Sequence, residues 1–210
     1  MCNLRYGGKG FLVASHEKRL IEQVIDAQLD GRSLSKDTVF ESLHHNKSSR
    51  FMTFYGRTAS VPLLTGKRDY CWSEFDLHMN SEVIYLNGAM AGPEACMPVM
   101  AERLSRIPPV KKDSLLILSG TARIDSCINR ASVNQEDDLF HQCVANLSST
   151  ASYIMVTDMK EVARNKEFFK EYLPPFINEW AEMFDPFILS VQVSEVDGRF
   201  SHIFVLTYRD

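Results

Sequence analysis

A cysteine, a histidine and an aspartate stand where the chain could carry out nucleophilic catalysis. Cys96 falls in the first turn of an expected helix, and His202 opens an apolar strand. A helix N-terminus and a nearby imidazolium both lower the pKa of a thiol, which makes the thiolate available as a nucleophile. The imidazole base needs an orienting carboxylate, and Asp158 at the end of another apolar strand is the candidate. These three residues predict a cysteine-dependent hydrolase or deamidase.

A run of small residues before the same helix could instead bind a phosphate group. The segment 87–94 reads NGAMAGPE and is expected to form a loop that leads into the helix. Unpaired backbone N–H groups and a partial positive charge at a helix N-terminus favour an anion. Small side chains would let that backbone approach a ligand closely. The candidate cofactor-binding positions are Gly88, Ala89, Ala91 and Gly92.

Basic side chains form a second candidate site for an anion. Lys111 and Lys112 precede an apolar strand, and Arg123 and Arg130 lie in the polar segment 120–133, which is expected to be a loop. Together they could bind one phosphate or one acidic group. A solvated loop is the alternative.

Cysteine usage favours a cytoplasmic protein without a metal centre. The five cysteines are widely spaced at positions 2, 71, 96, 127 and 143, and no CxxC or HxxxH pair occurs. An odd, scattered set and an N-terminus unlike a signal peptide argue against a disulfide framework. No zinc site is predicted.

Hydrophobic periodicity predicts alternating strands and helices in one domain spanning residues 1–210. Strands are expected at 11–14, 51–55, 70–78, 82–86, 114–118, 153–157, 187–196 and 200–208. Helices are expected at 17–29, from Ser35 to His45, from the segment 87–96 to Ile107, from Asn134 to Leu147, and on either side of Pro174 and Pro175. Asp197-Gly198 between two alternating runs is a strong hairpin signal. The fold class is therefore α/β or α+β, with a mixed central sheet, flanking helices and a C-terminal β-hairpin.

The order of elements over the first 160 residues resembles that of the GNAT-like acyltransferase superfamily. The resemblance implies a transferase that takes an acyl group from acyl-CoA. It also implies that the segment 87–96, after the fourth strand, cradles the pyrophosphate. The pairing of His202 with Cys96 is similar to the base and nucleophile of papain-like hydrolases, which is the alternative enzyme class.

Composition excludes several classes of protein. The chain has 210 residues, of which 45% are hydrophobic and 24% charged, and its net charge is -4. These values do not fit a disordered, collagen-like or coiled-coil chain. No apolar run reaches the roughly 18 residues of a membrane-spanning helix. The charge gives no general attraction for nucleic acid, so a small molecule or a protein is the expected substrate or partner.

Aromatic residues gather in the C-terminal third and support a non-catalytic alternative. They are Phe168, Phe169, Phe176, Trp180, Phe184 and Phe187. Such a set either completes the core or forms a surface for a protein partner or a homodimer. In the second case the chain is a binding or regulatory protein rather than an enzyme.

Overall fold

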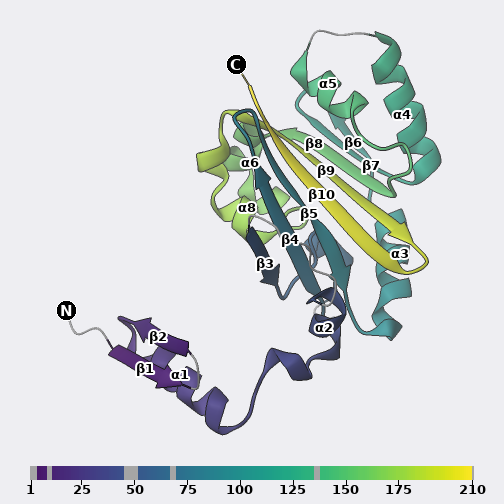
Figure 1. Cartoon of the computed structure of the whole chain (residues 1–210). Coiled ribbons are helices and arrows are strands. Elements are labelled where there is room, and N and C mark those ends of the chain that lie inside the picture. Colours follow the sequence, from purple (N-terminus) through teal and green to yellow (C-terminus); the bar gives the residue numbers. More distant parts are fainter. Residues whose placement is uncertain (1–3, 9–10, 45–51, 67–69, 135–137, 210) are drawn as a thin grey trace.

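The computed structural model shows an α+β fold built on one large antiparallel sheet (Figure 1). It describes residues 4–8, 11–44, 52–66, 70–134 and 138–209. The strands are β1 (Leu4–Gly8), β2 (Phe11–Ser15), β3 (Met52–Gly56), β4 (Trp72–Met79), β5 (Val83–Ala91), β6 (Val110–Lys112), β7 (Leu115–Ser119), β8 (Tyr153–Asp158), β9 (Phe187–Val196) and β10 (Arg199–Tyr208). No helix in these ranges is long and apolar enough to cross a membrane.

The helices are short, in keeping with the many turns of the chain. The α-helices are α1 (Lys18–Leu29), α2 (Thr38–His44), α3 (Met97–Ser105), α4 (Thr121–Asn134), α5 (Leu139–Ala145), α6 (Met159–Arg164), α7 (Lys166–Phe169) and α8 (Pro175–Glu179). The 3₁₀ helices are η1 (Leu34–Lys36), η2 (Pro62–Leu64), η3 (Glu94–Cys96) and η4 (Ala181–Phe184).

Eight strands form the main sheet in the order β3-β4-β5-β10-β9-β8-β7-β6. The predicted C-terminal hairpin is confirmed, because β9 pairs with β10 around Asp197, which has φ 53°, and Gly198, which has φ 73°. It lies in the middle of the sheet, between β5 and β8 (Figure 1). Where we expected mixed strand directions, each described pair in this sheet is antiparallel. Antiparallel pairing places the fold in the α+β class.

The N-terminal part makes a separate small unit. Strands β1 and β2 pair only with each other in a two-stranded sheet, and α1 contacts both. Figure 1 shows this unit apart from the main sheet, joined to it by the segment that holds η1. The helix α2 that follows contacts β4 and β5.

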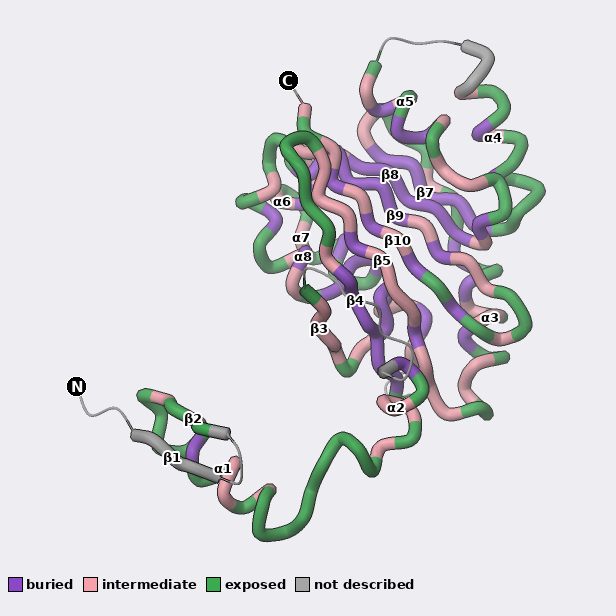
Figure 2. The backbone as a smooth tube through the Cα atoms, viewed as in Figure 1, coloured by how far each residue is buried: buried purple, intermediate pink, exposed green. Residues whose placement is uncertain are grey.

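Helices cover both faces of the sheet at β7 and β8. Leu115 and Ile117 belong to the core beneath α3, α6, α7 and α8, whereas the alternate residues Leu116 and Leu118 pack against α4 and α5. Burial on both faces explains why these strands are continuously apolar rather than alternating. They are buried along their length (Figure 2).

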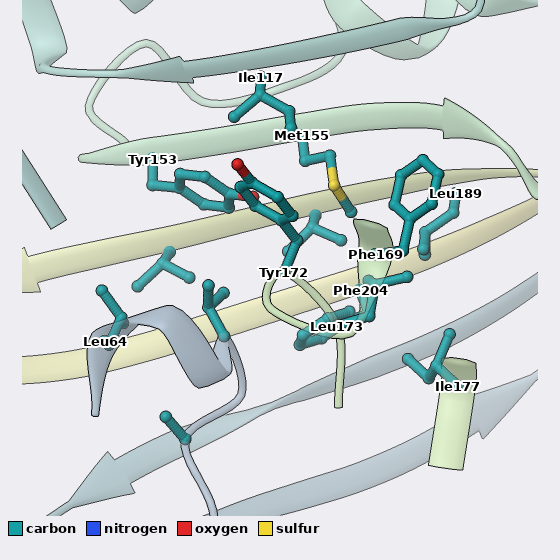
Figure 3. Close-up of a cluster of buried hydrophobic side chains, with 14 of the residues drawn as sticks. Leu64, Ile117, Tyr153, Met155, Phe169, Tyr172, Leu173, Ile177, Leu189 and Phe204 are labelled. Carbon is teal, nitrogen blue, oxygen red and sulfur yellow. The ribbon is translucent and has the colours of Figure 1, made fainter. Parts of the chain in front are cut away.

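The larger core lies on the face away from α4 and α5. Figure 3 shows its centre, where Tyr153 and Met155 of β8 lie near Phe169 of α7 and Tyr172, which follows α7. Tyr153 is completely buried, and burial raises the pKa of its hydroxyl far above the usual range. The phenol therefore stays neutral, as a core requires.

Two segments expected to be loops are regular structure instead. Residues Asn87 to Ala91 continue strand β5, so the backbone of Gly88, Ala89 and Ala91 is paired in the sheet rather than held in a loop. The segment 121–134 is helix α4, whose inward stripe is formed by Ile124, Cys127, Ile128 and Ala131. Its many serine, arginine and asparagine side chains obscured this helical spacing.

Candidate ligand-binding site

A pocket of about 290 Å³ opens between the end of the sheet and the helices α4 and α5. Its floor is apolar, with Leu116 from β7 and Phe140 and Val144 from α5, each less than 10% exposed. Four side chains with basic groups also line the pocket: Lys111, Lys112, Arg130 and His141. An apolar floor with a basic rim suits a ligand that carries both an apolar group and a negative charge.

Sheet register and helix spacing bring these residues together. Lys111 pairs with Leu116 across β6 and β7, so both side chains lie on the face that α4 and α5 cover. On α4, Arg130 and Ala131 follow Cys127 by three and four residues and therefore lie on the same side of the helix as Cys127. The pocket is thus made by elements that pack around a second, smaller core, in which Leu116 and Leu118 of β7 contact α4 and α5.

Three of the basic groups at the rim, those of Lys111, Lys112 and Arg130, have no acidic partner in the part of the chain that the structure describes. Within the described ranges, no ion pair involves Lys111, Lys112 or Arg130. The guanidinium of Arg130 donates to the carbonyl and hydroxyl oxygens of Ser126 at 3.1 and 3.3 Å. A guanidinium has five N–H donors, so others remain for a ligand.

His141 and Cys127 also line the pocket, but they do not form a catalytic pair. Nδ1 of His141 lies 3.0 Å from Oδ2 of Asp138, the residue that caps α5. No hydrogen bond joins His141 to Cys127 among the residues described. The thiol is half-buried in the wall of the pocket. It is therefore a group that a bound ligand would cover.

The predicted triad of Cys96, His202 and Asp158 is not brought together. Cys96 ends η3 and precedes α3, and no hydrogen bond links it to His202. On β9, Val193 pairs with His202, whereas Ile188 pairs with Asp158. Ile188 and Val193 are five positions apart, which corresponds to about 17 Å along the strand, so Asp158 and His202 are far from each other. The prediction failed because the sequence places each residue on an element but not the elements beside one another.

Asp158 has a structural role at the end of β8. Its carboxylate caps α6 by accepting the amide N–H of Lys160 at 2.9 Å, and it forms an ion pair with Arg209 near the C-terminus. An aspartate that accepts a helix N–H stabilises the first turn.

His202 is a core residue that spans two strands. It is 1% exposed, and its Nε2–H donates to the carbonyl oxygen of Glu74 on β4 at 2.7 Å. To reach β4 from β10, the imidazole passes over Gly88 of β5, the residue paired with His202. A Cβ at Gly88 would lie 2.0 Å from the Glu74 oxygen and 3.0 Å from Nε2. Glycine is required here for contact within the protein.

The other predicted cofactor-binding positions do not lie in the pocket. Ala89 and Ala91 are in β5, and Gly92 follows it and lies near Met97 and Tyr70. Three strands, β10, β9 and β8, separate β5 from β7 in the sheet. Long-range strand order is the information that the sequence pattern lacks.

The aromatic residues of the C-terminal third are divided between core and surface. Phe169 is 1% exposed and packs in the larger core, with Phe176, Phe184 and Phe187 partly buried against it. Trp180 and Phe168 are exposed. Most of this set therefore completes the core.

Metal and disulfide chemistry have no support in the described part of the chain. No group of three or more histidine, cysteine, aspartate or glutamate side chains there could hold a metal ion. Cys71, Cys96, Cys127 and Cys143 carry no disulfide.

No protein-family model matches this chain, and no curated protein or solved structure does so either. Function is therefore inferred from the pocket itself. The sequence pointed to Lys111, Lys112 and Arg130 as an anion site, and the structure brings these three together while Arg123 does not line the pocket. The pocket as a whole could not be predicted because its wall of Cys127, Arg130 and Ala131 belongs to α4, a segment expected to be a loop.

Proposed function

We propose that this protein is a cytoplasmic binding protein for an anionic ligand, with the pocket between β6, α4 and α5 as its site. One observation carries the proposal: Lys111, Lys112 and Arg130 line a pocket with an apolar floor, and none of them forms an ion pair with an acid among the described residues. Unpaired basic groups at the rim of a pocket bind phosphate or carboxylate through charge-assisted hydrogen bonds.

The floor defines the rest of the ligand. Leu116, Phe140 and Val144 offer apolar contact and no charge, so the ligand carries an apolar or aromatic group beside its anion. A phosphate-bearing acyl donor such as acyl-CoA, which the sequence led us to expect, is one ligand of this class.

A thermal-shift panel tests the proposal. The purified chain is heated with acyl-CoA, nucleotides, aromatic carboxylates and inorganic phosphate. A ligand present at 100 times its Kd adds about 2.7 kcal/mol to the free energy of unfolding, which raises Tm by about 5 to 10 °C in a domain of this size.

Matched variants locate the site. Arg130→Gln and Lys111→Gln should each weaken binding about tenfold, because each removes charge-assisted hydrogen bonds. Lys160→Gln removes one charge from α6, away from the pocket, and should leave the shift unchanged. A flat panel, or a shift that both pocket variants retain, would contradict the proposal.

Acyl transfer is a second candidate function, favoured by the thiol of Cys127 in the wall of the same pocket. In such a step the Cys127 thiolate attacks the thioester carbonyl of a bound acyl-CoA. The CoA thiolate leaves and takes up a proton, and the acyl group is held as a new thioester on Cys127.

Mass spectrometry separates transfer from binding alone. After incubation with acetyl-CoA, transfer predicts one added acetyl group that Cys127→Ser abolishes and Cys96→Ser retains. An unmodified chain, or an adduct on Cys96, would leave the protein as a binding protein only.

A further inference from the structure

The strand β6 ends the main sheet and lies between two pockets, one on each face. β6 pairs with β7 on one side, and no strand of the described chain pairs with its other side. The ligand pocket opens on the face of Leu116. A second pocket, of about 200 Å³, opens on the face of Leu115. Lys112, the last residue of β6, lines both.

This arrangement matches what an added strand needs. A peptide that pairs with the outer edge of β6 would turn successive side chains to opposite faces of the sheet. One side chain would meet Phe140 and Leu116, and the next would meet Phe168 and Leu115. Main-chain hydrogen bonds to an edge strand supply affinity in this mode, and alternate pockets supply specificity.

The charge of the edge specifies the occupant. Lys111 and Lys112 are exposed on β6, and Arg130 stands beside them at the rim. Lysines on an edge strand oppose pairing with a neutral or basic strand. A second copy of β6 would place its lysines opposite Lys111 and Lys112, and like charges opposite each other are unfavourable in a sheet. A strand that carries carboxylates would neutralise them.

We propose that β6 binds an extended acidic segment of a partner protein, which adds to the sheet as a ninth strand and places one apolar side chain in each flanking pocket. The inference rests on the proposed function, since the acidic segment is then the anionic ligand. β6 has only three residues, so the main chain offers few hydrogen bonds and the lysines supply much of the affinity.

A blocked, fluorescently labelled peptide tests this directly. Its centre is phenylalanine followed by leucine, with two glutamates on each side, and binding is measured by fluorescence anisotropy. Its affinity should fall about tenfold or more when lysines replace the glutamates. A similar loss is expected when the backbone nitrogens that face β6 are methylated, because strand addition needs those N–H donors.

Variants of the protein test whether the peptide binds at β6. Lys111→Glu and Arg130→Glu should each reduce affinity about tenfold, whereas Lys160→Glu, with the same change in net charge, should have no effect. Circular dichroism and Tm confirm that each variant is folded. If one variant does not fold, protection of the β6 amides from hydrogen exchange by the peptide is the second readout for the native chain.

The outcomes separate the two proposals. If the peptide fails while acyl-CoA or an aromatic carboxylate binds the pocket, the inference is wrong and the proposed function stands. If neither binds, both are wrong. Equal binding of the methylated peptide would show that charge alone acts and would overturn strand addition. A dimer that the peptide dissociates would identify a second copy as the occupant and would also overturn it.

Discussion

The indole Nε1–H of Trp72 donates a hydrogen bond to Oδ2 of Asp37 at 3.0 Å, which joins the first residue of β4 to the residue that caps α2. The hydroxyl of Tyr70 donates to the same oxygen at 2.7 Å, while Oδ1 accepts the amide N–H groups of Val39 and Phe40, both at 3.1 Å. One carboxylate thus fixes the start of α2 on the main sheet, at the point where the chain arrives from the N-terminal unit.

Removal of this carboxylate should loosen α2. The Tyr70 hydroxyl, the Trp72 indole and the Phe40 amide lower the pKa of Asp37 to about 2, so it is charged at neutral pH. We expect Asp37→Ala to cost about 1 to 2 kcal/mol, since it removes a helix cap together with the acceptor of two side-chain hydrogen bonds. Urea unfolding measures the loss.

Fluorescence gives a local readout of the same change. Trp72 and Trp180 are the two tryptophans of the chain, so in a Trp180→Phe background Trp72 reports alone. Its emission should shift when Asp37 is replaced. Tyr70→Phe serves as the partner in a double-mutant cycle. Additive effects of the two substitutions would show that this cluster does not act as one unit.

Gly88 should tolerate no side chain. In Gly88→Ala the new Cβ would lie 2.0 Å from the backbone oxygen of Glu74, which cannot move without breaking its bond to His202. We expect a loss on the order of 3 kcal/mol or more, because the overlap is with backbone rather than a flexible side chain. Thermal and urea unfolding would measure it.

Gly56→Ala is the matched control for that substitution. Among the described residues, the atom nearest to a Cβ there is in the side chain of Thr58, at an ordinary contact distance of 3.8 Å. Its effect should stay within about 1 kcal/mol of the wild type. Similar losses of stability in the two variants would mean that any strand glycine is sensitive to replacement by alanine. The crossing of His202 over β5 would then not explain the effect at Gly88.

His202 should make stability depend on pH from about pH 6.5 downward, starting above the range in which carboxylates titrate. Burial lowers the pKa of its imidazole from 6.5 to about 3. Between these values the unfolded chain binds a proton that the folded chain does not, so the free energy of unfolding falls as the pH falls. The slope is about 1.4 kcal/mol per pH unit for one such group.

The measurement compares wild type with His202→Gln between pH 6.5 and 4.5. Glutamine keeps an N–H donor for the Glu74 carbonyl but does not titrate. The wild type should lose stability more steeply over this window, while Asp37 does not contribute until lower pH. Parallel curves would show that His202 can be protonated in the folded protein.

Local patterns predicted much of the fold. The hairpin of β9 and β10 was found because alternation and an Asp-Gly turn act over neighbouring residues. Strands β7 and β8 were found as apolar runs, and α1 was found from its spacing. In contrast, β5 was cut short at Asn87, because Gly88 and Ala89 look like turn residues until the crossing of His202 is known.

Of the residues that line the pocket, only the basic ones were predicted from the sequence to form a site. Lys111, Lys112 and Arg130 could be recognised as basic residues, but the pocket exists because β6 is the last strand and α4 packs beside it. A spacing of three and four from Ile124 through Cys127 and Ile128 was the available signal for α4. No local pattern contains the order of strands, which is why Cys96, His202 and Asp158 were joined wrongly.

Cysteine labelling should show whether the pocket is occupied. Cys127 is half-buried in the pocket wall, whereas Cys143 lies in the smaller core and burial raises the pKa of its thiol. Iodoacetamide at pH 8 should therefore modify Cys127 well before Cys143 in the folded protein, because reaction requires an accessible thiolate. Mass spectrometry of peptides gives each rate separately.

An anionic ligand that fills the pocket should slow the reaction of Cys127 in proportion to its occupancy. It should leave the rate at Cys96, which does not line the pocket, unchanged. Equal slowing at Cys96 and Cys127 would point to a general stabilisation of the fold, and no slowing at saturating ligand would place the ligand elsewhere.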